Sequence, residues 1–492
     1  MGCILGIDLG TSSVKAMLLD TEGGVIGTQA QTYDVRIPQA SWAEQLPQDW
    51  WDGVCIILKE LQRKHPSSFS KIQAIGLSGQ MHGLVMIDKE GESVHPAILW
   101  LDQRSERECA SVREQARQNK WDEVLQNRIF PGFALPSLLW VKNNRREVYE
   151  RIYKIMQPKD YIRYRLTGKI GAEVTDASST LMFDIEKREW AFSVTDTLGL
   201  DSSLFTECHE PTEIAGSVTP KAHRETGLAE GIPVVYGAGD QQCQGVGNGV
   251  FQEGQAICNI GTGGQISVFS DKDIYDPLLR THTFCHCCSQ GYTIYGAVLC
   301  AGMALKWLKK NILHEESFEA LSQKASQIEA GSEGVFFFPY LAGERTPHMN
   351  PEAKGSFFGL QLCHDERHLV RAVMEGVAYA LKDSLMILEE MGIVSEEIIA
   401  SGGACASPVW LQILADVFQK NVRVCEVKEQ ACMGACILAG IGTGIFQDFD
   451  KACKRFVNYE DIIYIPNPDA AEVYQKSYHT FRELYNNLSP LF

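Results

Sequence analysis

The stretch GIDLGTSSVKAMLLD, residues 6–20, decides the fold because it joins two apolar runs through a short polar turn. The runs over residues 3–8 and 14–19 have the composition of buried strands, so we interpret residues 10–13 as a hairpin turn. The stretch NIGTGGQISVF, residues 259–269, repeats this pattern nearly half a chain length later. Self-similarity at this distance predicts a duplicated domain, with one glycine-rich, hydroxyl-bearing turn in each copy.

Strand-like and helix-like runs alternate along the rest of the chain, which is typical of an α/β protein. We expect strands over residues 72–77, 233–236 and 398–400, and helices over residues 136–143, 161–166, 369–388 and 408–418. A chain of 492 residues is too long for one ordinary hydrophobic core. Glycines are dense over residues 245–254, so we expect two domains, residues 1–246 and 247–492.

The composition disfavours several classes of partner. The chain has 45 basic and 62 acidic side chains and a net charge of −17, whereas nucleic acids and anionic membranes bind cationic faces. It has no apolar run of about 18 residues that could span a membrane, and its first residues lack a basic leader. We therefore expect a cytoplasmic protein whose 16 cysteines are reduced thiols that pack as small apolar groups.

One cluster has the residue types of a metal site. Cys285, His286, Cys287 and Cys288 are consecutive, whereas zinc sites usually combine a spaced pair with a second pair farther along. Adjacent side chains on an extended strand point to opposite faces of its sheet. We therefore expect a structural strand here rather than a metal site.

The two glycine-rich turns are suited to phosphate. A nucleotide triphosphate requires backbone N–H groups, hydroxyl donors and room for close approach. Asp8 ends an apolar strand, where burial of an unpaired carboxylate is costly. We interpret it as a direct or water-mediated Mg²⁺ ligand, with turn stabilisation as the alternative. The candidate phosphate-binding residues are Gly10, Thr11, Ser12, Ser13, Gly261, Thr262 and Gly263, with Lys15 as either an added charge or a solvent-facing side chain.

Motifs spread over nearly the whole chain resemble the FGGY carbohydrate kinases and, within that family, the xylulokinases. Besides the two turns, the matching segments are GLSGQMHGLVMID (76–88), AILWLDQRS (97–105), TDASSTLMFDI (175–185), VVYGAGDQQCQGVGNGV (234–250), FFPYLAGERTPHMNPEAKGSFFGL (337–360) and ASGGACASPVWLQILADVFQKNV (400–422). They follow one another in the family order. The resemblance implies two ribonuclease-H-like domains of the actin and Hsp70 type with a nucleotide cleft between them, and ATP and Mg²⁺ as cofactors.

The resemblance implies a catalytic role for Asp240. The general base of the family is the Asp of its G-A-G-D motif, which falls on Asp240 in this sequence. A carboxylate that follows a buried strand and a glycine-rich turn is suited to accept the proton of an alcohol as it attacks the γ-phosphate. From the residues alone, the alternative is an N-cap for a helix that begins at Gln241.

The resemblance also implies a sugar pocket on the N-terminal domain. Met81 and His82 match the substrate contact of xylulokinases, where glycerol kinases carry Arg-Glu. An imidazole can donate to or accept from sugar hydroxyls, and a methionine adds an adaptable apolar wall. Trp100 and Gln241 are further candidates, as an apolar platform and a hydroxyl partner.

The nucleoside segment resembles the family with one departure. Gly402, Gly403 and Ser407 are implied to bind ATP. Ala404 stands where the family often has a third glycine, so we expect its methyl group on the adenine face. Gly263 likewise replaces a frequent serine in the second phosphate turn.

The expected function is ATP-dependent phosphorylation of a ketopentose, D-xylulose to D-xylulose 5-phosphate. The dipeptide Gln241-Gln242 resembles glycerol kinases, so gluconate, ribulose, a deoxy-ketose and glycerol stay open as acceptors. A non-catalytic, actin-like nucleotide-binding protein is the other alternative. The pair Asp8 and Asp240 favours the enzyme, because a pure binder requires no base. Many relatives form dimers, and a homodimer is an open expectation.

Overall fold

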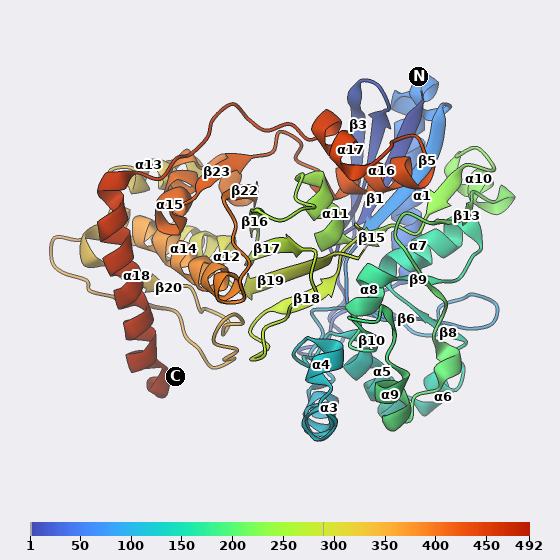
Figure 1. The fold of residues 1–492 in the computed structure, drawn as a ribbon, viewed down its shortest axis with the longest axis horizontal. Coiled ribbons are helices and arrows are strands. Elements are labelled where there is room, and N and C mark those ends of the chain that lie inside the picture. Colours follow the sequence, from blue (N-terminus) through green and yellow to red (C-terminus); the bar gives the residue numbers. More distant parts are fainter. Residues whose placement is uncertain (1, 289) are drawn as a thin grey trace. The chain divides into compact units, whose positions relative to one another are not determined.

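The computed structural model describes residues 2–288 and 290–492. The chain forms two compact units, each drawn from several segments of the sequence (Figure 1). The first unit contains Met1–Phe251, Phe284–Tyr292 and Val427–Val457, and the second contains Gln252–Thr283, Thr293–Glu426 and Asn458–Phe492. Among the described residues, no helix combines the length and the apolar character that a membrane span requires.

Two mixed sheets form the framework. In the first, the strand order is β13-β14-β5-β1-β2-β3, with β15 paired to β5. In the second, the order is β18-β19-β17-β16-β22-β23. The strands are β1 (Cys3–Leu9), β2 (Ser13–Asp20), β3 (Gly24–Thr32), β5 (Ile72–Gly79), β13 (Ile214–Ser217), β14 (Pro233–Val235), β15 (Ala238–Gly239), β16 (Gln255–Ile260), β17 (Gly264–Ser270), β18 (His282–Cys285), β19 (Tyr292–Val298), β22 (Glu397–Gly402) and β23 (Asn421–Val424).

The two sheets repeat one pairing scheme. β1 pairs antiparallel with β2 and parallel with β5. β16 pairs antiparallel with β17 and parallel with β22. The two predicted turns therefore occupy equivalent places, which confirms the duplication and the α/β class predicted from the sequence.

Helices cover the sheets, and the helices predicted from the sequence all form. The first unit contains α1 (Pro47–Lys64), α2 (Pro66–Phe69), α3 (Glu106–Asn119), α4 (Asp122–Leu125), α5 (Ala134–Asn144), α6 (Arg146–Tyr149), α7 (Pro158–Thr167), α8 (Val174–Ser178), α9 (Phe192–Thr197), α10 (Pro220–Thr226), α11 (Asp240–Gly247), α16 (Gln430–Gly442) and α17 (Phe449–Phe456). The second contains α12 (Gly302–Trp307), α13 (Phe318–Ala325), α14 (Glu366–Glu390), α15 (Pro408–Phe418) and α18 (Pro468–Leu488). Short strands complete the fold: β4 (Glu44–Gln45), β6 (Val85–Ile87), β7 (Ala97–Ile98), β8 (Lys154–Met156), β9 (Ala172–Glu173), β10 (Phe183–Asp184), β11 (Glu189–Trp190), β12 (Cys208–His209), β20 (Phe336–Phe338) and β21 (Ser356–Phe358).

Helix α16 packs against the first sheet, although it comes late in the chain (Figure 1). Two glycines permit the close approach. A Cβ atom at Gly76 of β5 would collide with the carbonyl oxygen of Ala435 on α16. A Cβ atom at Gly434 of α16 would collide with the carbonyl oxygen of Cys243. Because Cys243 lies on α11, this packing fixes α11, the helix that begins at Asp240.

Candidate functional site

Asp8 lies near the end of β1, just before the first predicted phosphate turn. Its Oδ1 accepts a hydrogen bond of 2.8 Å from the Ser78 hydroxyl. Burial raises the pKa of Asp8, although the Ser78 hydrogen bond and the charge of Lys15 oppose this rise. Nζ of Lys15 lies 2.6 Å from Oε2 of Glu429, just before α16. The charge of Lys15 is therefore already paired with a carboxylate that the sequence places far away.

The hydroxyl group of Thr11 is engaged within the protein. Nε1 of Trp100 donates to Thr11 Oγ1 over 2.9 Å, and Thr11 Oγ1 donates to Oε1 of Gln80 over 3.0 Å. The N–H of Gly10 closes the turn by donating to the Ser13 carbonyl oxygen over 3.0 Å. The single hydroxyl hydrogen of Thr11 is thus donated to Gln80 in this structure. Trp100, half-buried, links the sugar-side segment to this turn.

Asp240 is the first residue of α11, and Gly239 is the N-cap. The alternative that Asp240 is the N-cap is therefore wrong. Burial raises the pKa of Asp240 to about 7, and the negative charge of Asp8 adds to the rise, while hydrogen bonds from Gln241 oppose it. A carboxyl group with a pKa near neutrality is matched to general-base catalysis at physiological pH.

The two carboxylates fit a magnesium ion. Mg²⁺ prefers carboxylate oxygens and keeps several waters. Asp8 and Asp240 are close enough for the charge of one to raise the pKa of the other. A bound cation would relieve this repulsion, so the donor set suits the Mg²⁺ expected from the sequence.

A buried cluster of charges supports the loop before Asp240. Nζ of Lys159 lies 3.0 Å from Asp160 Oδ1, 2.9 Å from Glu173 Oε1 and 2.9 Å from Asp176 Oδ2. Arg163 also pairs with Asp160. These side chains are at most 1% exposed. Burial raises the pKa of Asp176 well above its ordinary value despite Lys159, so this carboxyl is protonated far more readily than a free one.

Helix α8 connects this charge cluster to the Asp240 loop and to His82. Thr175 Oγ1 donates to Glu173 Oε1 and accepts from the N–H of Gly239, each over 2.8 Å. The Ser179 carbonyl oxygen, just beyond α8, lies 2.8 Å from Nδ1 of His82. The TDASST motif thus anchors the Asp240 loop and His82 together. From the sequence, this motif could be identified only by its resemblance to the family, and no role could be assigned to it.

Met81 and His82 follow Gln80, the first residue after β5. His82 has a left-handed backbone, with φ of 69°, and its ring centroid lies 4.3 Å from that of Phe133. Because a carbonyl oxygen only accepts, Nδ1 of His82 is the donor in this hydrogen bond. Met81 is 3% exposed and packs beside Gly239, where an added Cβ atom would lie 2.8 Å from Met81 Cγ. Gln241, the second residue of α11, is half-buried.

In the second unit, the turn between β16 and β17 is bonded to the start of α12. The N–H of Gly302 donates to the Gly261 carbonyl oxygen, and that of Met303 to the Thr262 carbonyl oxygen, each over 3.0 Å. A Cβ atom at Gly263 would lie 2.8 Å from the Val298 carbonyl oxygen. This contact leaves little room for a side chain at Gly263, whereas Gly261 and Thr262 are exposed.

The nucleoside segment follows β22 in the same unit. Gly402 has a φ of 83°, a left-handed conformation that favours glycine, and both Gly402 and Gly403 are exposed. Ala404 is 3% exposed and belongs to the second hydrophobic core, so the expectation that its methyl group faces adenine is wrong. Ser407 is the N-cap of α15, and its Oγ accepts from the N–H of Trp410 over 3.2 Å.

The cysteine-rich segment departs from the expected strand. Strand β18 ends at Cys285, and the next three residues lie outside it. The ligand atoms of His286, Cys287 and Cys288 all lie within 4.8 Å of one another. The sequence expectation is therefore right for Cys285 and wrong for the three residues that follow.

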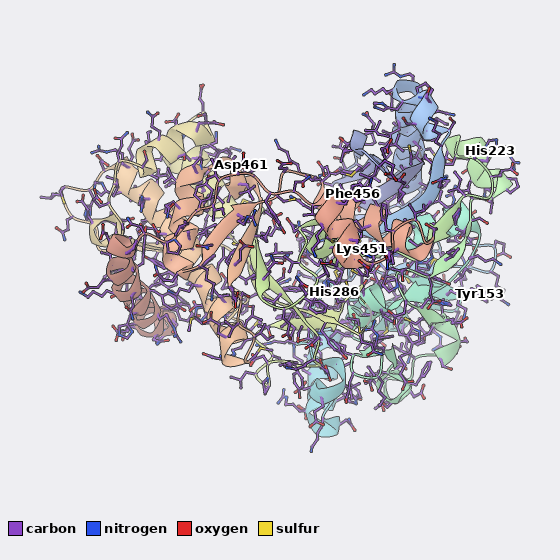
Figure 2. The ribbon with its side chains drawn as sticks, turned by 45° about the horizontal axis from the view of Figure 1, so that its top comes forward. Tyr153, His223, His286, Lys451, Phe456 and Asp461 are labelled. Atoms are coloured by element: carbon purple, nitrogen blue, oxygen red, sulfur yellow. The ribbon has the colours of Figure 1, made fainter. Side chains whose placement is uncertain are left out.

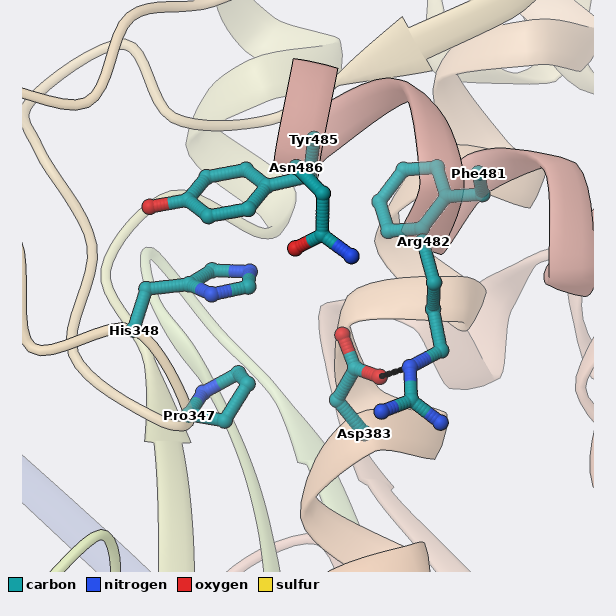
Figure 3. A pocket seen from close by; sticks show the side chains of 7 residues that line it. All are labelled: Pro347, His348, Asp383, Phe481, Arg482, Tyr485 and Asn486. Carbon is teal, nitrogen blue, oxygen red and sulfur yellow. Dashed lines mark ion pairs between the residues drawn. The ribbon is translucent and has the colours of Figure 1, made fainter. Parts of the chain in front are cut away.

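A pocket of about 210 Å³ in the second unit contains none of the predicted site residues (Figure 3). Arg482 points toward Asp383, with 3.8 Å between its Nε and Oδ1 (Figure 3), and Tyr478 donates to the same oxygen over 2.6 Å. The rings of Tyr485 and His348 stack with centroids 3.4 Å apart. Burial lowers the pKa of His348 to about 4. Two pairs of wall residues, Arg482 with Asp383 and His348 with Tyr485, thus contact each other. The pocket is lined by Pro347, His348, Asp383, Phe481, Arg482, Tyr485 and Asn486.

Comparison with known proteins covers the whole chain. Residues 3–247 match the N-terminal domain of the FGGY family of carbohydrate kinases, and residues 256–443 match its C-terminal domain. A xylulose kinase from Lactococcus lactis is 34% identical over 100% of this chain and 98% of that protein. A gluconokinase from Bacillus subtilis is 30% identical over 99% of this chain and 96% of that protein. The solved structure of a xylulose kinase from Lactobacillus acidophilus has a TM-score of 0.94 at 26% identity and covers 99% of both chains.

Proposed function

Because this chain belongs to the FGGY family of carbohydrate kinases, we propose that it transfers the γ-phosphate of ATP to a ketopentose, with D-xylulose as the best acceptor and D-xylulose 5-phosphate as the product. The observation that carries this proposal is the placement of Asp240. Its carboxyl group has a pKa of about 7 beside Asp8, and its loop is tied through Thr175 to the segment that also holds His82. The xylulose kinases among the relatives support the choice of sugar.

Asp240 acts as the general base in this proposal. It accepts the proton of the attacking sugar hydroxyl as the new bond to phosphorus forms and the bond to the ADP oxygen breaks. His82 binds a sugar hydroxyl, Met81 and Trp100 form apolar walls, and Gln241 supplies a further hydrogen-bond partner. Desolvation keeps the pKa of Asp240 near neutrality. At this pKa a substantial fraction of the group is ionised at neutral pH, and the carboxylate is a stronger proton acceptor than an ordinary aspartate.

Asp8 would hold Mg²⁺, directly or through water, and the ion would supply charge neutralisation on the phosphates. We assign phosphate binding to backbone groups of the two turns, at Gly10–Ser13 and 261–263, with Lys15 adding charge once its pairing with Glu429 opens. Gly402, Gly403 and Ser407 bind the nucleoside side of ATP. We assign the sugar site to residues 1–246, and the nucleoside side of ATP to residues 247–492.

The test is release of ADP from Mg·ATP by the purified chain across D-xylulose, D-ribulose, L-ribulose, L-xylulose, gluconate and glycerol. Strong stimulation by D-xylulose alone is the expected result. Preference for another compound would overturn the choice of sugar and leave the phosphotransfer mechanism in place. No stimulation by any of the six would contradict the proposal and favour a non-catalytic nucleotide-binding protein.

Gluconate is the second candidate acceptor, because the gluconokinase relative spans nearly the whole chain at similar identity. The same panel separates the two. We also propose that the chain acts in the cytoplasm, where ATP is available and its many thiols stay reduced. A homodimer stays a prediction, which sedimentation of the purified chain would check.

A further inference from the structure

We propose that His286, Cys287 and Cys288 form a binding site for a thiophilic divalent cation such as Zn²⁺. The site is distinct from the proposed magnesium site and does not depend on the proposed function. All three side chains are buried, with exposures of 2%, 2% and 9%. His286 belongs to the first unit, and Figure 2 shows Tyr153 and His223 at the outer edge of that unit, away from His286.

The geometry is close to that of a zinc site. The three ligand atoms lie within 4.8 Å of one another, and Cys287 Sγ lies 3.9 Å from Nδ1 of His286. A tetrahedral zinc with a sulfur ligand at about 2.3 Å and a nitrogen ligand at about 2.0 Å keeps the two ligand atoms about 3.5 Å apart. Binding therefore requires a movement of only a few tenths of an ångström at this pair.

The backbone of the segment holds the three side chains together. The N–H of His286 donates to the carbonyl oxygen of Gly291 over 2.7 Å, and the N–H of Gly291 donates to the carbonyl oxygen of Cys288 over 3.0 Å. The N–H of Cys288 donates to Nδ1 of His286 over 3.0 Å. A cation at Nδ1 replaces this one hydrogen bond and gains bonds to three ligands. The site is thus largely formed before a cation binds.

Charge favours a divalent cation over a monovalent one. Binding displaces one proton from each of the two thiols, so that two thiolates and one Zn²⁺ sum to zero charge, whereas Cu⁺ would leave a buried negative charge. Burial raises the pKa of Cys287, so its thiol keeps its proton at neutral pH in the absence of a cation. Binding of Zn²⁺ to the sulfur would displace this proton.

Helix α11 forms one wall of the site. Cys287 Sγ lies 3.7 Å from the Gln242 carbonyl oxygen, and a Cβ atom at Gly245 would lie 3.5 Å from Nε2 of His286. When Cys287 loses its proton, it no longer donates to Gln242, two residues from Asp240.

The first experiment titrates the reduced, chelator-treated full chain with Co²⁺, which reports thiolate ligands by intense charge-transfer absorption. We expect one equivalent to produce this absorption and Zn²⁺ to abolish it. The double substitution Cys287→Ser with Cys288→Ser should remove the absorption, and the matched control Cys55→Ser with Cys363→Ser should keep it. Equal absorption in both variants, or none in the unsubstituted chain, would overturn the proposal.

A second measurement does not depend on how the variants fold. X-ray absorption at the zinc edge of the unsubstituted chain, loaded with one equivalent of Zn²⁺, should show one imidazole nitrogen and at least two sulfur ligands. A shell of oxygen and nitrogen ligands alone would overturn the site.

Discussion

Replacing Lys159 by methionine removes the central cation of the buried charge cluster while keeping most of the side-chain volume. In the structure, Lys159 contacts three carboxylates at 2.9–3.0 Å, and all four side chains are at most 1% exposed. Arg163 pairs with Asp160 and so compensates only one of the three. Glu173 would keep its hydrogen bonds from Thr175 but lose its cation.

Breaking a buried ion pair by removing one partner costs about 3 to 5 kcal/mol of unfolding free energy, because the charge left behind stays desolvated. For a unit of this size, such a loss lowers the melting temperature by roughly 10 °C. The carboxyl groups left without a cation have pKa values raised above those of the unfolded chain. The stability deficit of the Lys159→Met variant relative to the unsubstituted protein should therefore shrink as the pH falls and grow as the pH rises.

Urea and thermal unfolding of the Lys159→Met variant, followed by circular dichroism at pH 5.5 and pH 8, would measure both effects. Lys476→Met is the matched control, since Lys476 pairs with Glu472 over 2.6 Å on the surface of α18, with both side chains about three-quarters exposed. We expect no measurable change in the control. If the two variants unfolded alike, or if Lys159→Met lost more stability at low pH than at high pH, the account of the cluster would be wrong.

Further predictions concern the site that this cluster supports. Thr175→Val should lower kcat by about 10- to 100-fold through misplacement of the Gly239–Asp240 loop, whereas Thr175→Ser should stay near the original rate; equal losses in both would remove the positioning role. His82→Ala should raise KM for the sugar by about tenfold and leave KM for ATP unchanged, as measured by initial rates. Turnover should rise with pH through about 7 as Asp240 loses its proton, and a pH-independent rate would contradict the assignment.

The sheets and turns could be predicted from local sequence because apolar runs and glycine-rich turns are properties of neighbouring residues. Contacts across the chain could not. Lys15 and Glu429 are 414 positions apart, and only the packing of α16 on the first sheet brings them together. The sequence shows that Ala404 has a methyl group but not which way this group points, so its place in the hydrophobic core could not be predicted. The convergence of the 286–288 side chains depends on where β18 ends, a boundary that periodicity sets only to within a few residues.

The central claim, that Asp240 is the base of sugar phosphorylation, is tested most directly by Asp240→Asn. This substitution keeps the shape of the side chain and removes its ability to accept the proton. With Mg·ATP and the best acceptor of the panel, kcat should fall by about 10²- to 10⁴-fold while the melting temperature is preserved or raised, since a poorly solvated carboxylate is removed. Turnover close to that of the unsubstituted chain would contradict the account.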